Sequence, residues 1–278
     1  MARRLFCQLG PWAYWLSQRK EVLRRRLGDV GRGPFAGGRR AEPLPALVYR
    51  HRSLIRRRLG QVDMALQENK AVNLALAAPR VCGVLIKPGE TFSFWRLVGP
   101  CTRRRGYRVG MTISNGGTGR GVGGGMCQFT NLLHWMVLHS PLTVTEHHHH
   151  DNLDLFPDYG RQVPFGVGTS IAYNYLDYRF RNDTDQCWQL RAWVEGEYLC
   201  GELRAQRLPA QKYHIRVEDE HFTREGGAVY RCNTILRQTV DRRTGAARED
   251  VLLHNHARVL YDTAGLDPSL FREADKND

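Results

Sequence analysis

The sequence lacks any apolar run that could span a membrane, because none of its 278 residues lies in a stretch of about 18 consecutive apolar side chains. It also lacks the features of a secretory signal. The first apolar patch, Leu9 to Leu16, contains Gly10 and Pro11 and is followed by polar and basic residues, with no small-residue cleavage site. These absences predict a protein of the cytoplasm that lies, at most, against the inner face of the membrane.

Paired cysteines are absent as well. The seven cysteines are widely scattered, odd in number and contain no C-x-x-C pair. This excludes a disulfide framework and a zinc ribbon and favours a reducing compartment, with most thiols acting as small buried hydrophobic groups. The segment Asn115 to Arg120 is rich in glycine but is not followed by Gly-Lys-Ser/Thr, so it is no Walker loop.

The positive charge is confined to one end of the chain. Of the net +13, the first 60 residues carry fifteen Lys/Arg against three Asp/Glu, whereas the remaining residues are nearly balanced. A neutral body argues against nucleic acid as a partner and favours a basic arm that meets an anionic surface. A basic amphipathic helix is expected from Pro11 to Leu27, which either contacts anionic lipid or packs its apolar side on the body.

Helical patterns come first and strand patterns later, which predicts an α+β fold rather than a doubly wound α/β fold. We expect N-terminal helices at Leu47 to Leu59 and Val62 to Ala78, the latter ended by Pro79, followed by a mostly antiparallel β domain. The expected strands are Val81 to Ile86, Thr91 to Trp95, Thr143 to Thr145, Thr169 to Phe180 and Trp188 to Glu195, followed by short strands from Leu199 to Val217 and from Val229 to Val240 and a return from Asp250 to Leu260. The central helix is expected at Cys127 to His139. Lys87 to Glu90 is expected to form a type II turn, because Pro88 and Gly89 stand at its two central positions. The tail beyond Asp262 is expected to be frayed. The expected domains are 1–60 (basic arm and linker), 61–208 and a β-rich extension, 209–278.

A glycine-rich loop that leads into the central helix is the most informative stretch. Seven of the eleven residues from Asn115 to Gly125 are glycine, and Cys127 follows almost at once. Glycine lets the backbone approach a ligand, and free amides at a helix start lower a thiol pKa and can hold an oxyanion. From these residues alone, a nucleophilic Cys127 and a merely buried one are equally favoured.

A thiolate needs an imidazole, and the run His147 to His150 can fold back beside Cys127. His134 lies two turns along the same helix, too far for a direct hydrogen bond. Glu146, Asp151 and Asp177 could orient a ring. Two histidines with Cys127 would also suit zinc, which leaves a metal-dependent hydrolase open as an alternative, although we expect neither a metal nor another cofactor.

The motifs resemble a known family. Lys87-Pro88-Gly89-Glu90-Thr91-Phe92-Ser93-Phe94-Trp95 and, further on, Gly123-Gly124-Gly125-Met126-Cys127-Gln128 are similar in order and spacing to the VanW (vancomycin-resistance W) pattern. Gly160-Arg161 and Tyr175 to Asn182 continue it, so the resemblance covers about half the chain, from Glu68 to Arg204. Gln162 departs from the pattern, since the family often has Asp-Ala-Thr after Gly-Arg.

The resemblance implies a bacterial cell-wall role linked to glycopeptide resistance. Longer, exported relatives are implicated as cysteine L,D-transpeptidases, so the expected activity is acyl transfer on peptidoglycan peptides or precursors. Carried over by motif, Cys127 is the nucleophile and His150 or His149 its partner, and the expected substrate-binding residues are Gly123, Gly124, Gly125, Gln128, Ser93 and Arg161. The alternative is a non-catalytic module that binds cell-wall precursors or a resistance partner at the inner membrane face.

Overall fold

The structure is a computed structural model that describes residues 6, 9–57, 63–114, 117–149, 152–157, 162–173 and 175–272. In chain order its elements are α1 (Pro11–Gly28), β1 (Ala46–Leu54), α2 (Met64–Val81), β2 (Val84–Ile86), β3 (Thr91–Ser93), α3 (Phe94–Val98), η2 (Arg103–Arg105), β4 (Val109–Ser114), β5 (Gly117–Val122), α4 (Met126–Leu138), β6 (Thr143–Glu146), β7 (Leu153–Asp154), β8 (Arg179–Arg181), β9 (Trp188–Glu195), β10 (Tyr198–Ala205), β11 (Gln211–Glu225), β12 (Ala228–Asp241), β13 (Ala247–Val259), η3 (Pro268–Leu270) and β14 (Phe271–Arg272).

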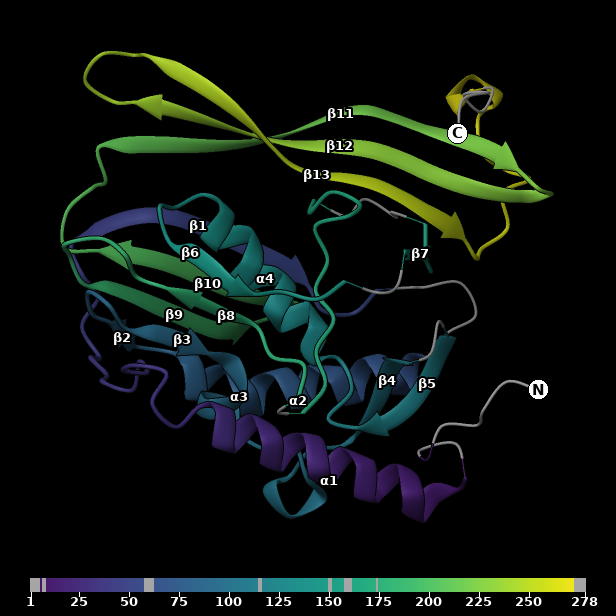
Figure 1. Ribbon diagram of the computed structural model, residues 1–278, viewed down its shortest axis with the longest axis horizontal. Helices are drawn as coiled ribbons and strands as arrows, with labels where there is room; N and C mark the ends of the chain where they lie inside the picture. Colours follow the sequence, from purple (N-terminus) through teal and green to yellow (C-terminus); the bar gives the residue numbers. More distant parts are fainter. Residues whose placement is uncertain are drawn as a thin grey trace.

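The body is built on a sheet in the order β1-β10-β9-β2, in which every neighbouring pair is antiparallel. Helix α4 packs against β10 and β1, and α2 packs against β9 (Figure 1). A small sheet in the order β3-β8-β6 and the hairpin β4-β5 complete the body. The predicted α+β class is confirmed.

The main core lies between α2, α4 and the sheet. It holds large side chains with almost no exposure, among them Trp188, Tyr178, Phe92, Phe129 and Leu74. Burying a Leu or Phe side chain stabilises a fold by about 1.5–3 kcal/mol, so this cluster fixes α4 on the sheet. The start of α4 is thereby held in one place, which matters because Cys127 is its second residue.

The C-terminal part forms a separate layer of long strands. Strands β11, β12 and β13 make an antiparallel sheet with β14 and β7 at its edges, and Figure 1 shows it running across the molecule on the side away from α1. A second, smaller core of Trp135, Leu138, Val167 and Ile235 joins this sheet to α4. Helix α4 therefore has packing partners on both sides.

Several sequence predictions of local structure are confirmed. The helix expected at Cys127 to His139 is α4, and the strand at Trp188 to Glu195 is β9. The turn at Lys87 to Glu90 closes with a hydrogen bond from the Glu90 amide to the Lys87 carbonyl, and Gly89 has a φ of 79°. This positive φ is what a type II turn requires at its third residue.

Two predictions in the N-terminal part are wrong. The helix expected at Leu47 to Leu59 is the strand β1, because its backbone pairs along β10 and the partly buried Val48 and Tyr49 pack on the core. Tertiary pairing thus overrides the local helical pattern. Proline 79 does not end α2, which continues to Val81, because Pro79 removes only one N–H near the helix end and the fully buried Val81 holds the last turn.

Three further predictions are corrected. Helix α3 begins at Phe94, inside the strand expected from Thr91, because the Ser93 Oγ caps it by accepting from the Arg96 amide at 3.4 Å. The strand expected at Thr169 to Phe180 forms only at its end, where β8 begins at Arg179. Thr169 and Ser170 instead bond to α4 and to the histidine segment. The tail beyond Asp262 is partly ordered, since β14 pairs in parallel with β11.

Candidate functional site

Cys127 lies where the glycine-rich segment turns into α4. The segment is less of a loop than the sequence indicates, because Gly117–Val122 forms strand β5 paired with β4, which leaves only Gly123 to Gly125 as the turn. Gly125 is the N-cap of α4 with a φ of 99°, and no side chain caps the helix. The turn therefore delivers Cys127 to a cavity of about 1300 Å³ that the glycines also line.

Gly124 has no room for a side chain. A Cβ placed there would lie 2.3 Å from the Gly110 carbonyl carbon, and such backbone atoms have no flexible end that could move aside. The Asn73 side chain on α2 donates to the Gly124 carbonyl at 2.9 Å and to the Arg108 carbonyl at 3.0 Å. Asn73 is itself completely buried, so this bridge pins the glycine turn against α2.

The thiol of Cys127 differs from expectation. The residue is partly exposed toward the cavity, but burial of the sulfur raises the thiol pKa, although the backbone amides of Ile171 and Cys127 itself favour the thiolate. The sequence analysis predicted a lowered pKa from the helix start. That prediction is wrong because desolvation outweighs the two amides. The resting thiol is therefore protonated at neutral pH and must lose its proton to a base before it can attack.

The histidine segment reaches the same cavity. His147, His148 and His149 all line it with Cys127, whereas His150 lies outside the described residues. Burial lowers the pKa of His147 to about 4 and also lowers the pKa of His149, which the neighbouring His148 lowers further. These two imidazoles are therefore neutral at pH 7, and the same burial disfavours their protonated form.

Three imidazoles lie against one another beside the cavity. The ring of the buried His134 is stacked on the His147 ring at 4.1 Å, and the His149 ring meets the His147 ring edge-on at 4.3 Å. His134 also contacts the Tyr178 hydroxyl at 3.1 Å, within the core. Among the described residues, no hydrogen bond joins Cys127 to an imidazole, and His149 has no hydrogen-bond partner there. Among the described residues, His149 is therefore the imidazole of this cluster that has no partner at either ring nitrogen.

The segment 168–171 connects Cys127 to the histidines. The Thr169 amide donates to the Asn131 Oδ1 at 2.7 Å, and the Thr169 hydroxyl contacts both Asn131 and Thr130 of α4. On its other side, the Ser170 amide donates to the His148 carbonyl at 2.7 Å, and His147 Nε2 contacts the Gly168 carbonyl at 3.1 Å. This bridge could not be predicted from the sequence, because it depends on side chains that meet only in the fold.

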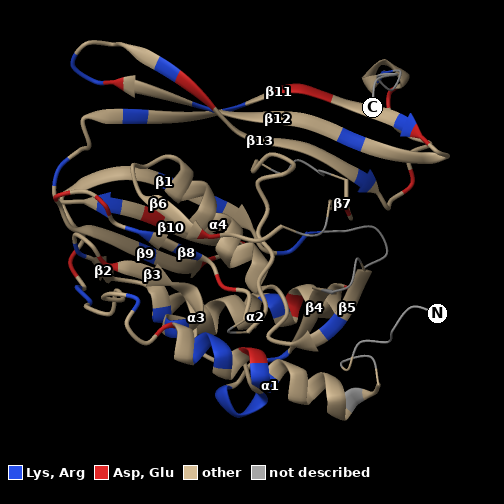
Figure 2. Cartoon of the chain, viewed as in Figure 1, with Lys and Arg blue, Asp and Glu red and all other residues tan. Residues whose placement is uncertain are grey.

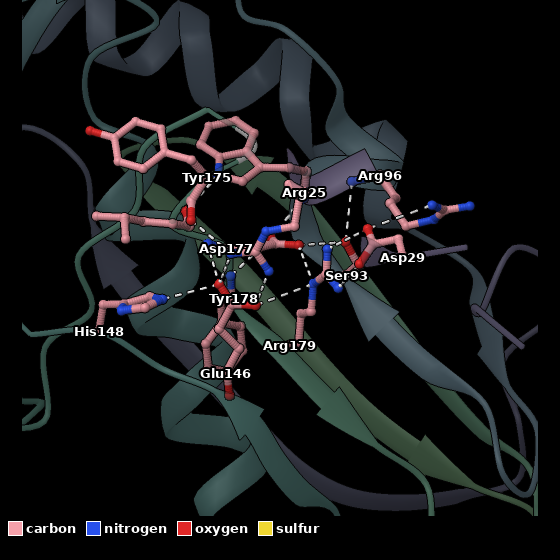
Figure 3. Close-up of polar contacts among 12 residues, drawn as sticks. Arg25, Asp29, Ser93, Arg96, Glu146, His148, Tyr175, Asp177, Tyr178 and Arg179 are labelled. Carbon is pink, nitrogen blue, oxygen red and sulfur yellow. Dashed lines mark hydrogen bonds and ion pairs between the residues drawn. The ribbon is translucent and has the colours of Figure 1, made fainter. Parts of the chain in front are cut away.

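A network of buried charges supports the histidine segment from behind (Figure 3). Glu146 accepts from Arg25 of α1, from the Asp177 amide at 2.8 Å and from His148 Nε2 at 3.0 Å. Burial alone would raise the pKa of Glu146, but the bonds from Arg25 and His148 hold it below its usual value. Of the carboxylates proposed to orient a ring, Glu146 contacts a histidine and Asp151 lies outside the described residues.

Asp177 has a different role in this network. Its carboxylate accepts from the Ser93 hydroxyl at 2.5 Å, the Trp95 amide at 3.0 Å and Arg179 Nε at 2.8 Å. Burial raises its pKa despite these bonds. Ser93, which was expected to bind substrate, is 1% exposed and caps α3, so it supports the fold behind the cavity instead of lining it.

Of the two remaining side chains predicted to bind substrate, the structure places Gln128 at the cavity and does not describe Arg161. Gln128 lines the cavity, and its amide nitrogen donates to the Ser53 hydroxyl at 2.9 Å and the Leu54 carbonyl at 2.8 Å, which ties α4 to β1. Arg161 lies outside the described residues. The substrate-binding roles of these residues stay predictions. Within the described ranges, no three His, Cys, Asp or Glu side chains are grouped to hold a metal ion.

Sequence reasoning missed Lys70. This residue of α2 is 7% exposed and lines the cavity, and its stem lies against Gly125, where an added Cβ would be 2.3 Å from the Lys70 Cγ. No hydrogen bond or ion pair of Lys70 is found among the described residues, and burial together with the charge of Arg57 lowers its pKa to about 7. The signal was present in the sequence as three polar residues, Gln67, Lys70 and Asn73, spaced three apart on the buried face of α2.

The chain is similar in sequence to known proteins. The family model described as VanW like protein matches residues 69–204. A vancomycin B-type resistance protein, VanW of Enterococcus faecalis (strain ATCC 700802 / V583), is 38% identical over 200 residues, which are 72% of this chain and 72% of that protein. The uncharacterized protein YoaR of Bacillus subtilis (strain 168) is 30% identical over 128 residues, 45% of this chain and 39% of that protein. No solved structure matches the chain.

An α+β body with a cysteine at the glycine-led start of its central helix defines the structural class. The chain belongs to the VanW family, a family of vancomycin-resistance proteins, as the resemblance of its motifs implied.

Proposed function

We propose that this protein is a cysteine-dependent acyl transferase of the L,D-transpeptidase kind that acts on peptidoglycan stem peptides, with Cys127 as nucleophile. The observation that carries the proposal is the position of Cys127 at the glycine-led start of α4, on one cavity with the neutral histidines His147 and His149. Two backbone amides directed at its sulfur support it. Family membership is consistent with a cell-wall role but leaves the reaction open.

The protonated thiol sets the order of steps. A neutral imidazole, which we assign to His149, takes the S–H proton as the sulfur attacks the carbonyl carbon of a donor amide bond. The C–N bond then breaks, the leaving amine takes the proton from the imidazolium, and a thioester on Cys127 remains. An acceptor amine attacks the thioester, gives up its own proton through the same imidazole, and restores the thiol. Each step conserves protons, and no other reagent is required.

The amides of Cys127 and Ile171 suit the charge that develops during this reaction. Donors already held near the sulfur can stabilise the tetrahedral oxyanion without rearranging, which is worth about 3–4 kcal/mol per donor in related reactions. Thr169 and Asn131 hold the segment that carries Ile171, so they act as positioning residues. His150, the other histidine implied by the family pattern, remains a prediction outside the described residues.

Lys70 supplies a cation for the substrate. Peptides of the cell wall carry carboxylates, and a buried ammonium without an acidic partner gains most of its stabilisation when such a group arrives. The start of α4, which also borders the cavity, has no side-chain cap, and helix starts favour anions. We assign to Lys70 the binding of a substrate carboxylate, next to the bond that Cys127 attacks.

A cross-linking assay tests the proposal. Wild type, Cys127→Ala and Cys101→Ala are each incubated with purified muropeptides, and the products are separated and identified by mass. Cys101 is a matched control, because it lines the same cavity and burial raises its pKa to about 11. Wild type and Cys101→Ala should change the cross-links, and Cys127→Ala should not. If wild type is inactive, or if Cys127→Ala works as well as wild type, the catalytic role is refuted.

A non-catalytic binding module is the second candidate, and the raised pKa of the Cys127 thiol favours it. Such a module would hold a cell-wall precursor in the cavity without attacking it. Calorimetric titration of the same muropeptides distinguishes the two. Binding by wild type and by Cys127→Ala with equal affinity, together with no change in cross-links, supports the module and contradicts the enzyme.

A further inference from the structure

Helix α1 turns its polar side inward. Figure 1 shows it lying along the outside of the body, away from the β11–β13 sheet. Apart from the fully buried Ala13, the side toward the body carries mostly polar or charged residues that are partly buried: Ser17, Gln18, Glu21, Val22 and Arg25. Arg25 ion-pairs with Glu146, which anchors the helix by charge. The sequence analysis left open a helix that packs its apolar side on the body, and this alternative is wrong.

The apolar side of α1 faces outward. Trp12, Leu16, Leu23 and Leu27 are 62%, 47%, 58% and 65% exposed. Leu16, Leu23 and Leu27 follow Trp12 by four, eleven and fifteen residues, close to whole numbers of helical turns, so the four side chains form one stripe along the helix. Neighbouring Trp15 is also 56% exposed. A continuous apolar stripe of this kind on a protein surface indicates an interaction site.

Cations border this stripe on both sides. By helical spacing, Arg19 and Arg26 lie on one flank and Lys20 and Arg24 on the other, and all four are exposed. Figure 2 shows basic residues of α1 in blue. The Arg19 guanidinium stacks over the Trp15 ring at 5.0 Å. The acidic residues of this region point elsewhere, because Glu21 lies on the body side and Asp29 pairs with Arg179. The outward face of α1 is therefore apolar along its centre and positive along its edges.

We propose that α1 lies flat on an anionic lipid surface, with the stripe Trp12, Leu16, Leu23 and Leu27 in the headgroup–acyl boundary and the flanking cations at the phosphates. This pattern of apolar centre and basic edges is that of interfacial helices. A second copy of the chain is a poorer occupant, since a two-fold interface would place these cations against their own copies. Among the helices the structure describes, none has the length and apolar character to cross a membrane.

Binding of α1 to a lipid surface would also determine how far the cavity lies from the membrane. Tyr14 and Gln18 of α1 line the cavity that contains Cys127, and Arg25 connects α1 to the histidine segment through Glu146 and His148. A bilayer against the outer side of α1 would therefore place this part of the cavity wall one helix diameter from the headgroups, about 10 Å. The lipid surface goes beyond the proposed acyl transfer, because it rests on α1 alone.

Vesicle co-sedimentation tests the lipid surface. Full-length protein is mixed with vesicles of phosphatidylcholine alone or of phosphatidylcholine with phosphatidylglycerol. Wild type should sediment with the anionic vesicles and detach as salt is added. Leu23→Gln/Leu27→Gln should bind about a hundredfold more weakly, and Arg19→Gln/Arg26→Gln about tenfold or more. Val251→Gln is the matched control, because Val251 is equally exposed at 55% but lies on β13.

The same samples provide the outcomes that would overturn the proposal. Circular dichroism should show every variant folded, since the substituted side chains point outward. Absence of wild type from the anionic pellet, or equal binding by Leu23→Gln/Leu27→Gln, would refute the lipid surface. Sedimentation velocity tests whether a second copy of the chain binds the stripe instead. If wild type does not bind vesicles but forms a dimer that Leu23→Gln/Leu27→Gln abolishes, the stripe serves self-association. Cross-linking of soluble muropeptides is measured separately, so its failure leaves this result intact.

Discussion

Two cations are buried to nearly the same extent in this protein, and their surroundings are opposite. Arg179 on β8 is 4% exposed and Lys70 on α2 is 7% exposed. Arg179 bonds to both oxygens of Asp29 at 2.6 and 2.8 Å and to Asp177 at 2.8 Å (Figure 3). Burial alone would lower the pKa of Arg179, but these carboxylates raise it above its usual value, whereas the pKa of Lys70 falls to about 7.

The difference indicates what each cation does. Arg179 has its counter-charges within the protein and joins α1 to the sheet β3-β8-β6, so its role is complete in the folded chain. Lys70 is held against the glycine turn without an acidic partner among the described residues, and it faces the cavity. A buried charge of this kind costs free energy until a ligand offsets the cost. The ion pairs of Arg179 therefore have a structural role, whereas Lys70 is part of the cavity that contains Cys127.

The largest expected loss of stability comes from removing the paired cation. Arg179→Met leaves Asp177 and Asp29 buried without their partner and should lower the free energy of unfolding by about 3–5 kcal/mol. Urea denaturation measures this loss. Arg181→Met, two residues along β8, is the control, because the Arg181 pair with Asp183 is half exposed and should be worth less than about 1 kcal/mol. A loss below about 1 kcal/mol for Arg179→Met would show that the two cations do not differ as described.

Removing Lys70, which has no acidic partner among the described residues, should have an effect of the opposite sign. Because the pKa of Lys70 falls from 10.5 to about 7 on folding, the unfolded chain binds more protons between those pH values. The burial of Lys70 therefore destabilises the folded protein most at low pH. The free energy of unfolding rises by roughly 1.4 kcal/mol per pH unit as the pH rises through this window, and this gain is lost as the pH falls toward 7. Lys70→Met should be more stable than wild type at pH 7, and this advantage should shrink toward pH 10.

Urea denaturation at several pH values between 7 and 10 measures the free energy of unfolding of wild type and of Lys70→Met. Other groups that titrate in this range contribute equally to both proteins, so the difference between the two reports Lys70. A stability difference that does not change with pH would mean that Lys70 is not desolvated. At neutral pH the same variant should lose affinity for muropeptides while retaining its fold. Unchanged muropeptide binding would contradict the assignment of Lys70 to the substrate carboxylate.

The sequence predicted the parts of the fold that depend on local chemistry. Apolar spacing located α4, alternating residues located β9, and Pro88-Gly89 identified the turn before β3. Strand β1 was missed because its conformation depends on pairing with β10, about 150 residues away in the chain. The first turn of α3 was missed because its cap, Ser93, is a short signal within an aromatic run that also suits a strand.

The candidate site was predicted only where it depends on neighbouring residues in the sequence. The glycine run followed by Cys127 is contiguous, so its position at a helix start could be read directly. The pKa of the thiol could not, because it depends on how much protein surrounds the sulfur, and the local amides predict the opposite direction. Lys70 is distant in sequence from Cys127, and the bridge through Thr169 and Asn131 exists only once the chain is folded.

The central claim is that the Cys127 sulfur forms a covalent bond to its substrate. Intact-mass spectrometry of the protein, quenched in acid shortly after mixing with a stem-peptide donor and no acceptor amine, tests it most directly. The account predicts that wild type and Cys101→Ala gain the mass of the acyl group, that digestion locates it on Cys127, and that hydroxylamine removes it. Cross-linking activity with no adduct on wild type, or the same adduct on Cys127→Ala, would contradict it.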